Sequence, residues 1–240
     1  MRQHLADAAR LLVPRRDDPH GPLPPMLLAL TVVTGLVDAF SYLALGHVLV
    51  ANMTGNVVFS GFALAGAPGF QWWALVLAVA AFLLGAWTGG HLSRIFGLHR
   101  GRHLFGASFL ELALVAGAWI TCLVAPPPFV DWPLTALIVL LGVGMGLQNA
   151  TARALSVPDL TTTVLTLTGI AADATSGQGS RLGRRLIPVL MMFGGALTGA
   201  ALVVRGHDAA ALGVATTLLA AIVTAAAVTM RSRGSWTARA

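Results

Sequence analysis

The sequence predicts an all-α fold: a polytopic membrane helical bundle of six transmembrane helices and two short broken or re-entrant helices. Hydrophobic residues make up 56% of the 240 residues and charged residues only 10%, whereas a soluble domain carries about 25% charged residues. Six apolar runs also reach the roughly 20 residues that one membrane span requires. They cover residues 26–46, 72–94, 103–124, 132–153, 185–205 and 209–230.

Arginine placement favours six spans over eight. All 15 basic residues are arginines, and basic residues collect on the cytoplasmic side of a membrane protein. With six spans, both termini and loops 95–102 and 175–184 are cytoplasmic, and Arg205 is the one arginine outside. Eight spans would place five arginines outside. We therefore expect a multi-pass protein of the bacterial inner (plasma) membrane with both termini cytoplasmic.

The domain organisation follows from these spans. Residues 1–25 form a polar cytoplasmic N-terminal tail, residues 26–230 a single membrane domain, and residues 231–240 a basic cytoplasmic tail. The expected environment is the lipid bilayer. The net charge of +6 does not indicate nucleic acid, because the basic residues flank apolar runs and act as topology determinants.

Two stretches of the chain repeat. Residues 35–39 match 146–150 at a spacing of 111, and residues 85–92 match 195–202 at a spacing of 110. A fixed period of this kind indicates duplication, although two Gly/Ala-rich helices can also resemble each other by chance. Repeat one would cover 26–124 and repeat two 132–230. Each would hold three spans, an odd number, so the repeats would be inverted in the membrane, with a functional site between them.

Two shorter, more polar segments, 48–66 and 158–174, follow the first span of each repeat. Non-helical backbone at membrane depth is tolerated only inside the protein or along a wet cavity. Re-entrant segments that meet near the midplane would therefore line a pathway. The alternative is that both are ordinary short helices, tilted or interfacial.

Each short segment carries a polar cluster. The first contains Asn52, Thr54 and Asn56, and the second contains Thr161, Thr162 and Thr163. A half-helix that starts near Thr54 would direct backbone N–H groups and a positive dipole end into the membrane, which favours an anion or a polar neutral solute. We predict that these six residues, together with Asn149, bind the substrate. Hydrogen bonding between helices is the alternative role.

Two acidic residues lie within predicted spans. Asp38 lies in the first span and Glu111 in the third, and an intramembrane acid is a candidate functional residue by default. At the repeat spacing, Asp38 corresponds to Asn149, so one half keeps an ionisable group where the other has an amide. We predict proton coupling at Asp38 and Glu111. A structural role, in which Asp38 bonds a neighbouring helix or an arginine, is the alternative.

Other motifs indicate packing rather than chemistry. Gly85–Gly89 and Gly195–Gly199 are both G-x-x-x-G, a pattern that lets helices approach closely. The sequence contains no H-E-x-x-H, no G-x-S-x-G, no metal-spaced Cys/His cluster and no Gly-rich phosphate loop. We therefore expect no enzyme activity, no cofactor and no metal.

The strings Asp38-Ala39-Phe40-Ser41-Tyr42-Leu43 and Ala51-Asn52-Met53-Thr54-Gly55-Asn56 closely resemble the YoaK-like family of bacterial membrane proteins. Residues 146–150 and 161–166 look like that family's second signature. The resemblance covers the chain after residue 25. It implies an integral membrane protein and supplies no substrate, because the family is a domain of unknown function.

The function that the sequence favours is a small-solute secondary transporter or channel with a midplane site between two repeats. The alternative is a non-transporting membrane scaffold or accessory subunit. A wet, polar centre would favour transport, whereas a dry and tightly packed centre would favour the scaffold. The solute is unidentified, and the sequence leaves a homo-oligomer open.

Overall fold

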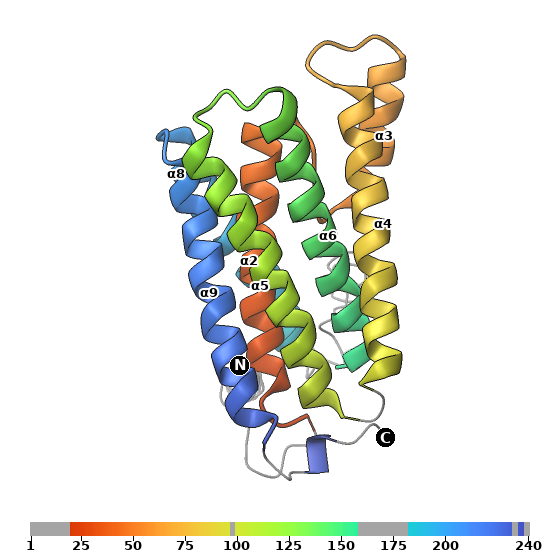
Figure 1. The fold of residues 1–240 in the computed structure, drawn as a ribbon, viewed down its shortest axis with the longest axis vertical. Coiled ribbons are helices and arrows are strands. Elements are labelled where there is room, and N and C mark those ends of the chain that lie inside the picture. Colours follow the sequence, from red (N-terminus) through yellow and green to blue (C-terminus); the bar gives the residue numbers. More distant parts are fainter. Residues whose placement is uncertain (1–19, 97–98, 158–181, 232–234, 238–240) are drawn as a thin grey trace.

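The computed structural model describes residues 20–96, 99–157, 182–231 and 235–237. Within these ranges every regular element is a helix, and the long helices lie side by side along the bundle axis (Figure 1). The elements are α2 (Leu23–Ala44), α3 (Met53–Leu64), α4 (Trp72–Ile95), α5 (Arg100–Val124), α6 (Asp131–Leu155), α8 (Leu182–Val204), α9 (Asp208–Thr229) and the short η2 (Ser235–Thr237).

Six of these helices are long and apolar enough to cross a bilayer, namely α2, α4, α5, α6, α8 and α9. Helix α3 has 12 residues, which corresponds to about 18 Å at 1.5 Å per residue and is too short for a span. The predicted all-helical fold with six spans is confirmed, and α3 falls inside the predicted short segment 48–66. Segment 158–174 lies outside the described residues.

The two ends of the bundle differ in charge. Trp236 is buried near Gly21 and Gly101, so the start of α2, the start of α5 and the segment after α9 share one end. We call it the arginine-rich end. Of the described arginines, only Arg205 belongs to the opposite end, where α8 passes into α9. Trp72 and Trp132, exposed at the starts of α4 and α6, also lie at that opposite end.

Glycines allow two close helix crossings, one between α2 and α8 and one between α4 and α6. A Cβ added to Gly195 would lie 2.2 Å from the carbonyl oxygen of Val32, and one added to Gly85 would lie 2.0 Å from that of Val143. The helix backbones are therefore in direct contact, as the G-x-x-x-G pattern predicts.

The two crossings use matching residues. Gly35 lies against Met192 and Ala196 in the α2–α8 crossing. In the α4–α6 crossing, Gly146 lies against Phe82 and Ala86. Gly35 and Gly146 are 111 positions apart in the sequence. Met192 and Phe82, like Ala196 and Ala86, are 110 positions apart, so the contacts follow the spacing of the two sequence repeats.

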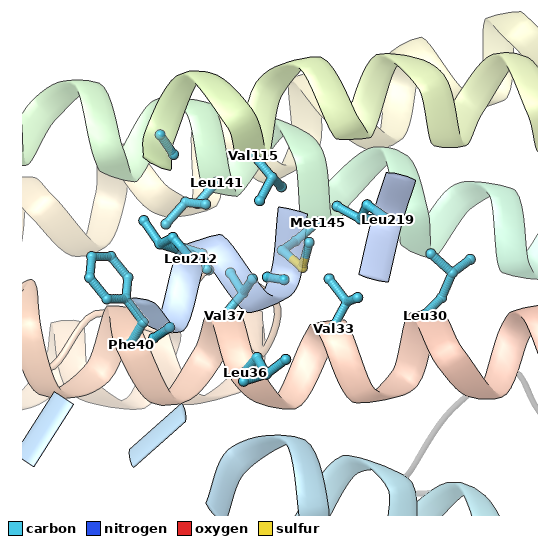
Figure 2. Packing of buried hydrophobic residues seen from close by; sticks show 14 of the residues in the cluster. Leu30, Val33, Leu36, Val37, Phe40, Val115, Leu141, Met145, Leu212 and Leu219 are labelled. Atoms are coloured by element: carbon cyan, nitrogen blue, oxygen red, sulfur yellow. The ribbon is translucent and has the colours of Figure 1, made fainter. Parts of the chain in front are cut away.

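The centre of the bundle is apolar. Leu30, Val33, Val37 and Phe40 on α2 pack in one cluster with residues of α5, α6 and α9, including Val115, Leu141, Met145, Leu212 and Leu219 (Figure 2). Most of these side chains are completely inaccessible to solvent. The described centre is thus filled by hydrocarbon side chains, and the polar residues lie beside it.

Candidate functional site

The chain turns back into the bundle after α2. Helix α2 ends at Ala44, yet the backbone N–H groups of Val50 and Ala51 donate to Oδ1 of Asp38 at 3.1 and 2.8 Å. Asp38 lies six residues before the end of α2, about 9 Å along the helix axis. Residues 45–52 therefore run back beside α2, and α3 then returns to the end of the bundle at which α2 ends and α4 begins (Figure 1). This is a re-entrant hairpin, which we call the 45–64 hairpin.

Asn56 holds residues 45–52, the first arm of this hairpin, which we call the descending arm. Its Oδ1 accepts a hydrogen bond from the Leu49 N–H at 2.9 Å, and its Nδ2 donates to the Leu49 carbonyl oxygen. Asn56 is completely buried. Together with Asp38, it satisfies the N–H groups of three consecutive residues in an irregular segment, as non-helical backbone at membrane depth requires.

Asn52 and Thr54 lie at the start of α3 and are exposed. Helix α3 begins at Met53, one residue before the predicted start near Thr54, and Asn52 occupies its N-cap position without a side-chain capping hydrogen bond. These two side chains are therefore at the depth of Asp38 and free to meet a polar partner. A lipid tail is a poor neighbour for an amide or a hydroxyl, so this face of the hairpin is suited to a wet or protein-lined space.

A polar stripe runs along α2 through Asp38. Thr31, Thr34, Asp38 and Ser41 follow each other at spacings of three, four and three residues, which places them on one helix face. The stripe meets α6 through Gln148, whose Nε2 donates to Oγ1 of Thr34 at 2.7 Å and to the Leu30 carbonyl oxygen at 3.2 Å. Neither Gln148 nor Thr34 is among the residues that the sequence predicts for the site.

Asp38 is only half satisfied. It is 7% exposed, and its Oδ2 has no hydrogen-bond partner within the described part of the chain. A buried polar atom without a partner is costly and marks a functional candidate. The partner of Oδ1 is the re-entrant backbone, whereas the sequence alternatives were a neighbouring helix or an arginine.

Glu111 is the second buried acid. It is 1% exposed, its side chain lies against Gly144 of α6, and its Oε1 lacks a hydrogen-bond partner in the described ranges. A Cβ added to Gly144 would lie 3.9 Å from Cγ of Glu111, in ordinary van der Waals contact. Glu111 and Asp38 belong to different seams, because Glu111 lies between α5 and α6 and Asp38 faces the hairpin.

Of the remaining residues predicted to bind the substrate, the structure describes Asn149 alone. Asn149 is half-buried, and its Oδ1 accepts a hydrogen bond from Nε of Arg153 one turn later on α6, at 3.0 Å. Thr161, Thr162 and Thr163 lie outside the described residues. In the ranges that the structure describes, no group of three His, Cys, Asp or Glu residues could hold a metal ion.

An aromatic cluster, which the sequence analysis missed, covers the outer part of the hairpin. The rings of Tyr42, His47, Phe59 and Phe70 follow one another at centroid distances of 5.0 to 6.0 Å, and a ring nitrogen of His47 lies 3.2 Å from the Gly69 carbonyl oxygen. The cluster joins the end of α2 to both arms of the hairpin. Its spacing in the sequence follows no single helix or strand period, so only the fold reveals it.

Comparison with known proteins identifies relatives and no function. The family described as "Protein of unknown function (DUF1275)" matches residues 26–225. The UPF0700 transmembrane protein YoaK of Bacillus subtilis (strain 168) is 31% identical over 145 residues. The match covers 59% of this chain and 61% of YoaK, so the chain spans less than two thirds of that relative. No solved structure matches.

Proposed function

We propose a transport function from one premise: the chain belongs to the membrane-protein family described as "Protein of unknown function (DUF1275)". Our proposal is that it is a secondary transporter of a small solute. Asp38 would couple a proton to the position of the 45–64 hairpin, and the exposed Asn52 and Thr54 would meet the solute.

One observation carries this proposal: an intramembrane carboxylate holds a re-entrant backbone segment with one oxygen and keeps the other oxygen unpaired. A carboxylate accepts strong hydrogen bonds from N–H groups, and protonation weakens them because charge-assisted bonds are roughly twice as strong as neutral ones. Gain or loss of a proton at Asp38 would therefore change how firmly residues 50 and 51 are held. Broken segments of this kind form the substrate sites of many transporters.

The matching glycine crossings support a second part of the proposal, the inverted repeat. Helices α2 and α6 begin the two proposed repeats, and three spans, α2, α4 and α5, precede α6. Equivalent helices would then cross the membrane in opposite directions, which is the arrangement of the inverted repeats in many secondary transporters.

The packed apolar centre favours a second candidate, a non-transporting scaffold or accessory subunit. The central side chains drawn in Figure 2 are apolar and almost completely inaccessible to solvent. Under the transport proposal, this packing is the barrier of a closed conformation. Under the scaffold proposal, it is permanent.

Purified protein in proteoliposomes distinguishes these functions. Uptake of small anions, neutral metabolites and amines would be screened with and without an imposed pH gradient. We expect gradient-driven accumulation of at least one solute. Asp38→Asn should abolish accumulation and retain downhill exchange, because the amide keeps an acceptor for residues 50 and 51. Glu111→Gln should have a smaller effect, since Glu111 does not touch the hairpin.

Two outcomes would contradict the proposal. Accumulation at the wild-type rate by the Asp38→Asn protein would show that the carboxylate is structural. Absence of both accumulation and exchange for every solute class, in protein that unfolds cooperatively on heating, would favour the scaffold.

A further inference from the structure

We infer that the outer face of α4 binds the headgroup of an anionic glycerophospholipid at the arginine-rich end of the bundle. The site consists of Leu84, Trp87, His91 and Arg94, which we call the α4 outer stripe. This inference concerns the lipid around the protein, so it stands or falls independently of the proposed transport function.

The four residues of the α4 outer stripe lie on one face of the helix. They follow each other at spacings of three, four and three residues, which place them above one another on a helix, and all four are exposed. Gly85 and Gly89, which pack against α6, are buried on a different face of α4. The stripe therefore faces outward from the bundle, where a membrane protein meets lipid.

The chemistry along the stripe follows the order of the groups in a phospholipid. Leu84 is hydrocarbon, and Trp87 is an amphipathic ring of the kind that collects at the membrane interface. His91 adds a polar group, and Arg94, next to the last residue of α4, adds the positive charge. From Leu84 to Arg94 the helix rises about 15 Å, half of the roughly 30 Å hydrocarbon core. The stripe thus covers the depth of one leaflet, from acyl chain to phosphate.

Two hydrogen-bond donors lie within reach of one phosphate group. Trp87 and His91 form a stacked pair, with ring centroids 5.8 Å apart and ring planes inclined by 19°. The His91 imidazole has an N–H to donate, and leaving it without a partner in hydrocarbon is costly. Arg94 lies three residues further on, so the Cβ atoms of the two side chains are about 5 to 6 Å apart. Guanidinium and phosphate form strong charge-assisted hydrogen bonds.

The charge of the stripe selects an anionic lipid over a zwitterionic one. Helix α4 contains no Asp or Glu, so it offers no carboxylate to the ammonium group of phosphatidylcholine or phosphatidylethanolamine. Anionic lipids are attracted by basic residues at the cytoplasmic surface. The arginine-rich end, to which Arg94 belongs, is the end expected on that side.

The corresponding face of α8 shows that an exposed helix face of this bundle does not require such residues. At the repeat spacing of 110, the positions that match the last three residues of the stripe are Leu197, Ala201 and Val204. Leu197 and Val204 are exposed, as their counterparts are, and Val204 lies at the opposite end of the bundle. Of these two equivalent faces, the one at the arginine-rich end carries the aromatic and basic side chains.

Native mass spectrometry of the purified full chain in detergent tests this inference. Phosphatidylglycerol and phosphatidylcholine with the same acyl chains would be titrated and the bound lipids counted. We expect the wild type to bind phosphatidylglycerol about fivefold more tightly or better, the gain from one basic residue near an anionic headgroup. Sodium phosphate should not displace the lipid, because Leu84 and Trp87 contact its acyl and glycerol groups.

Variants that borrow the residues of the second repeat locate the site. The triple variant Trp87→Leu, His91→Ala, Arg94→Val should lose the preference for phosphatidylglycerol. Arg94→Gln alone should reduce it about fivefold. Arg205→Gln removes an exposed arginine at the opposite end and should keep the wild-type preference. If the triple variant does not fold, Arg94→Gln decides the question.

Four results would overturn the inference: equal binding of the two lipids by the wild type, wild-type preference in Arg94→Gln, an equal loss in Arg205→Gln, or displacement of the lipid by free phosphate. A wild-type dimer that dissociates in the triple variant would assign this face to a second copy of the chain and would also reject the lipid site.

Discussion

Asn56 pairs with both backbone polar groups of Leu49, so one side chain replaces the strand partner that the descending arm of the hairpin lacks. An irregular segment within a helical bundle has no strand or helix of its own in which to pair its backbone groups. Its N–H and C=O groups must be satisfied by side chains or remain buried and unpaired. The Asn-Met-Thr-Gly-Asn string therefore has a structural purpose at its last position.

We predict that Asn56→Leu destabilises the protein by about 2 to 4 kcal/mol, since it leaves two buried backbone groups without partners. Asn52→Leu, at the exposed asparagine of the same string, should change the free energy of unfolding by less than about 0.5 kcal/mol. Thermal or denaturant unfolding in a fixed detergent measures both. If both variants lost the same free energy of unfolding, the hydrogen bonds between Asn56 and Leu49 would not be the cause of the loss.

The glycine crossings give a second prediction. Gly85→Ala and Gly195→Ala place a methyl group 2.0 and 2.2 Å from backbone carbonyl oxygens, which no side-chain rotation relieves. We expect each variant to lose about 1 to 3 kcal/mol or more through forced helix separation.

Two neighbouring glycines supply the controls for this prediction. Gly90 and Gly194 have no heavy atom within 4 Å of an added Cβ, so Gly90→Ala and Gly194→Ala should unfold at or slightly above the wild-type midpoint. The same unfolding scans serve for all four proteins. A Gly194→Ala loss as large as that of Gly195→Ala would show that helix α8 does not present the glycine face described here.

A third prediction concerns the equivalence of the two crossings. An added Cβ at Gly199 lies 3.1 Å from the Cβ of Ala39, and one at Gly89 lies 2.7 Å from that of Ala150. Disulfides need Cβ atoms about 3.5 to 4.5 Å apart, so a small helix displacement permits both. In a Cys122→Ser background, Ala39→Cys with Gly199→Cys and Ala150→Cys with Gly89→Cys should each form a disulfide under mild oxidation.

Mobility on non-reducing gels, or mass spectrometry of peptides, reports these disulfides. The shifted pair Ala39→Cys with Gly194→Cys serves as a control that should stay reduced. Formation of only one of the two expected disulfides would contradict the matched geometry and weaken the inverted-repeat proposal.

The fourth prediction concerns orientation. Ile95 and Ala65 are exposed at the arginine-rich end and at the opposite end. In the Cys122→Ser background, a membrane-impermeant maleimide should label Ala65→Cys in intact cells, and Ile95→Cys only after lysis, because basic ends stay cytoplasmic. The reverse pattern would invert the topology predicted from arginine placement.

The sequence predicted the spans well because span length and arginine placement are direct consequences of bilayer thickness and insertion. It also predicted the close packing at Gly85 and Gly195, since a recurring small residue on an apolar helix has few other uses. The predicted span starting at residue 26 begins at Leu23 in the structure, because Pro24 and Pro25 are tolerated in the first helical turn.

The candidate site was predicted less completely. Asp38 and the string around Asn56 were identified as unusual, but their partners were not, because a carboxylate bonded to backbone groups 12 and 13 residues away leaves no sequence pattern. Gln148 was noticed only as a neighbour of Asn149. Trp236 lies in the segment that the sequence predicted to be a basic cytoplasmic tail, yet it is 8% exposed and lies against Gly101 and Gly21. This burial depends on the distant start of α5.

The two crossings have a mechanical consequence. Helix α2 is fastened to α8 and α4 is fastened to α6 by backbone contacts that admit no intervening side chain. Each fastened couple therefore combines one helix from residues 26–124 with one from residues 132–230. A rearrangement that preserves these contacts cannot hinge the first half of the chain against the second. Under the transport proposal, the α2–α8 couple would have to slide or rock past the α4–α6 couple, so each moving unit would combine helices from both proposed repeats.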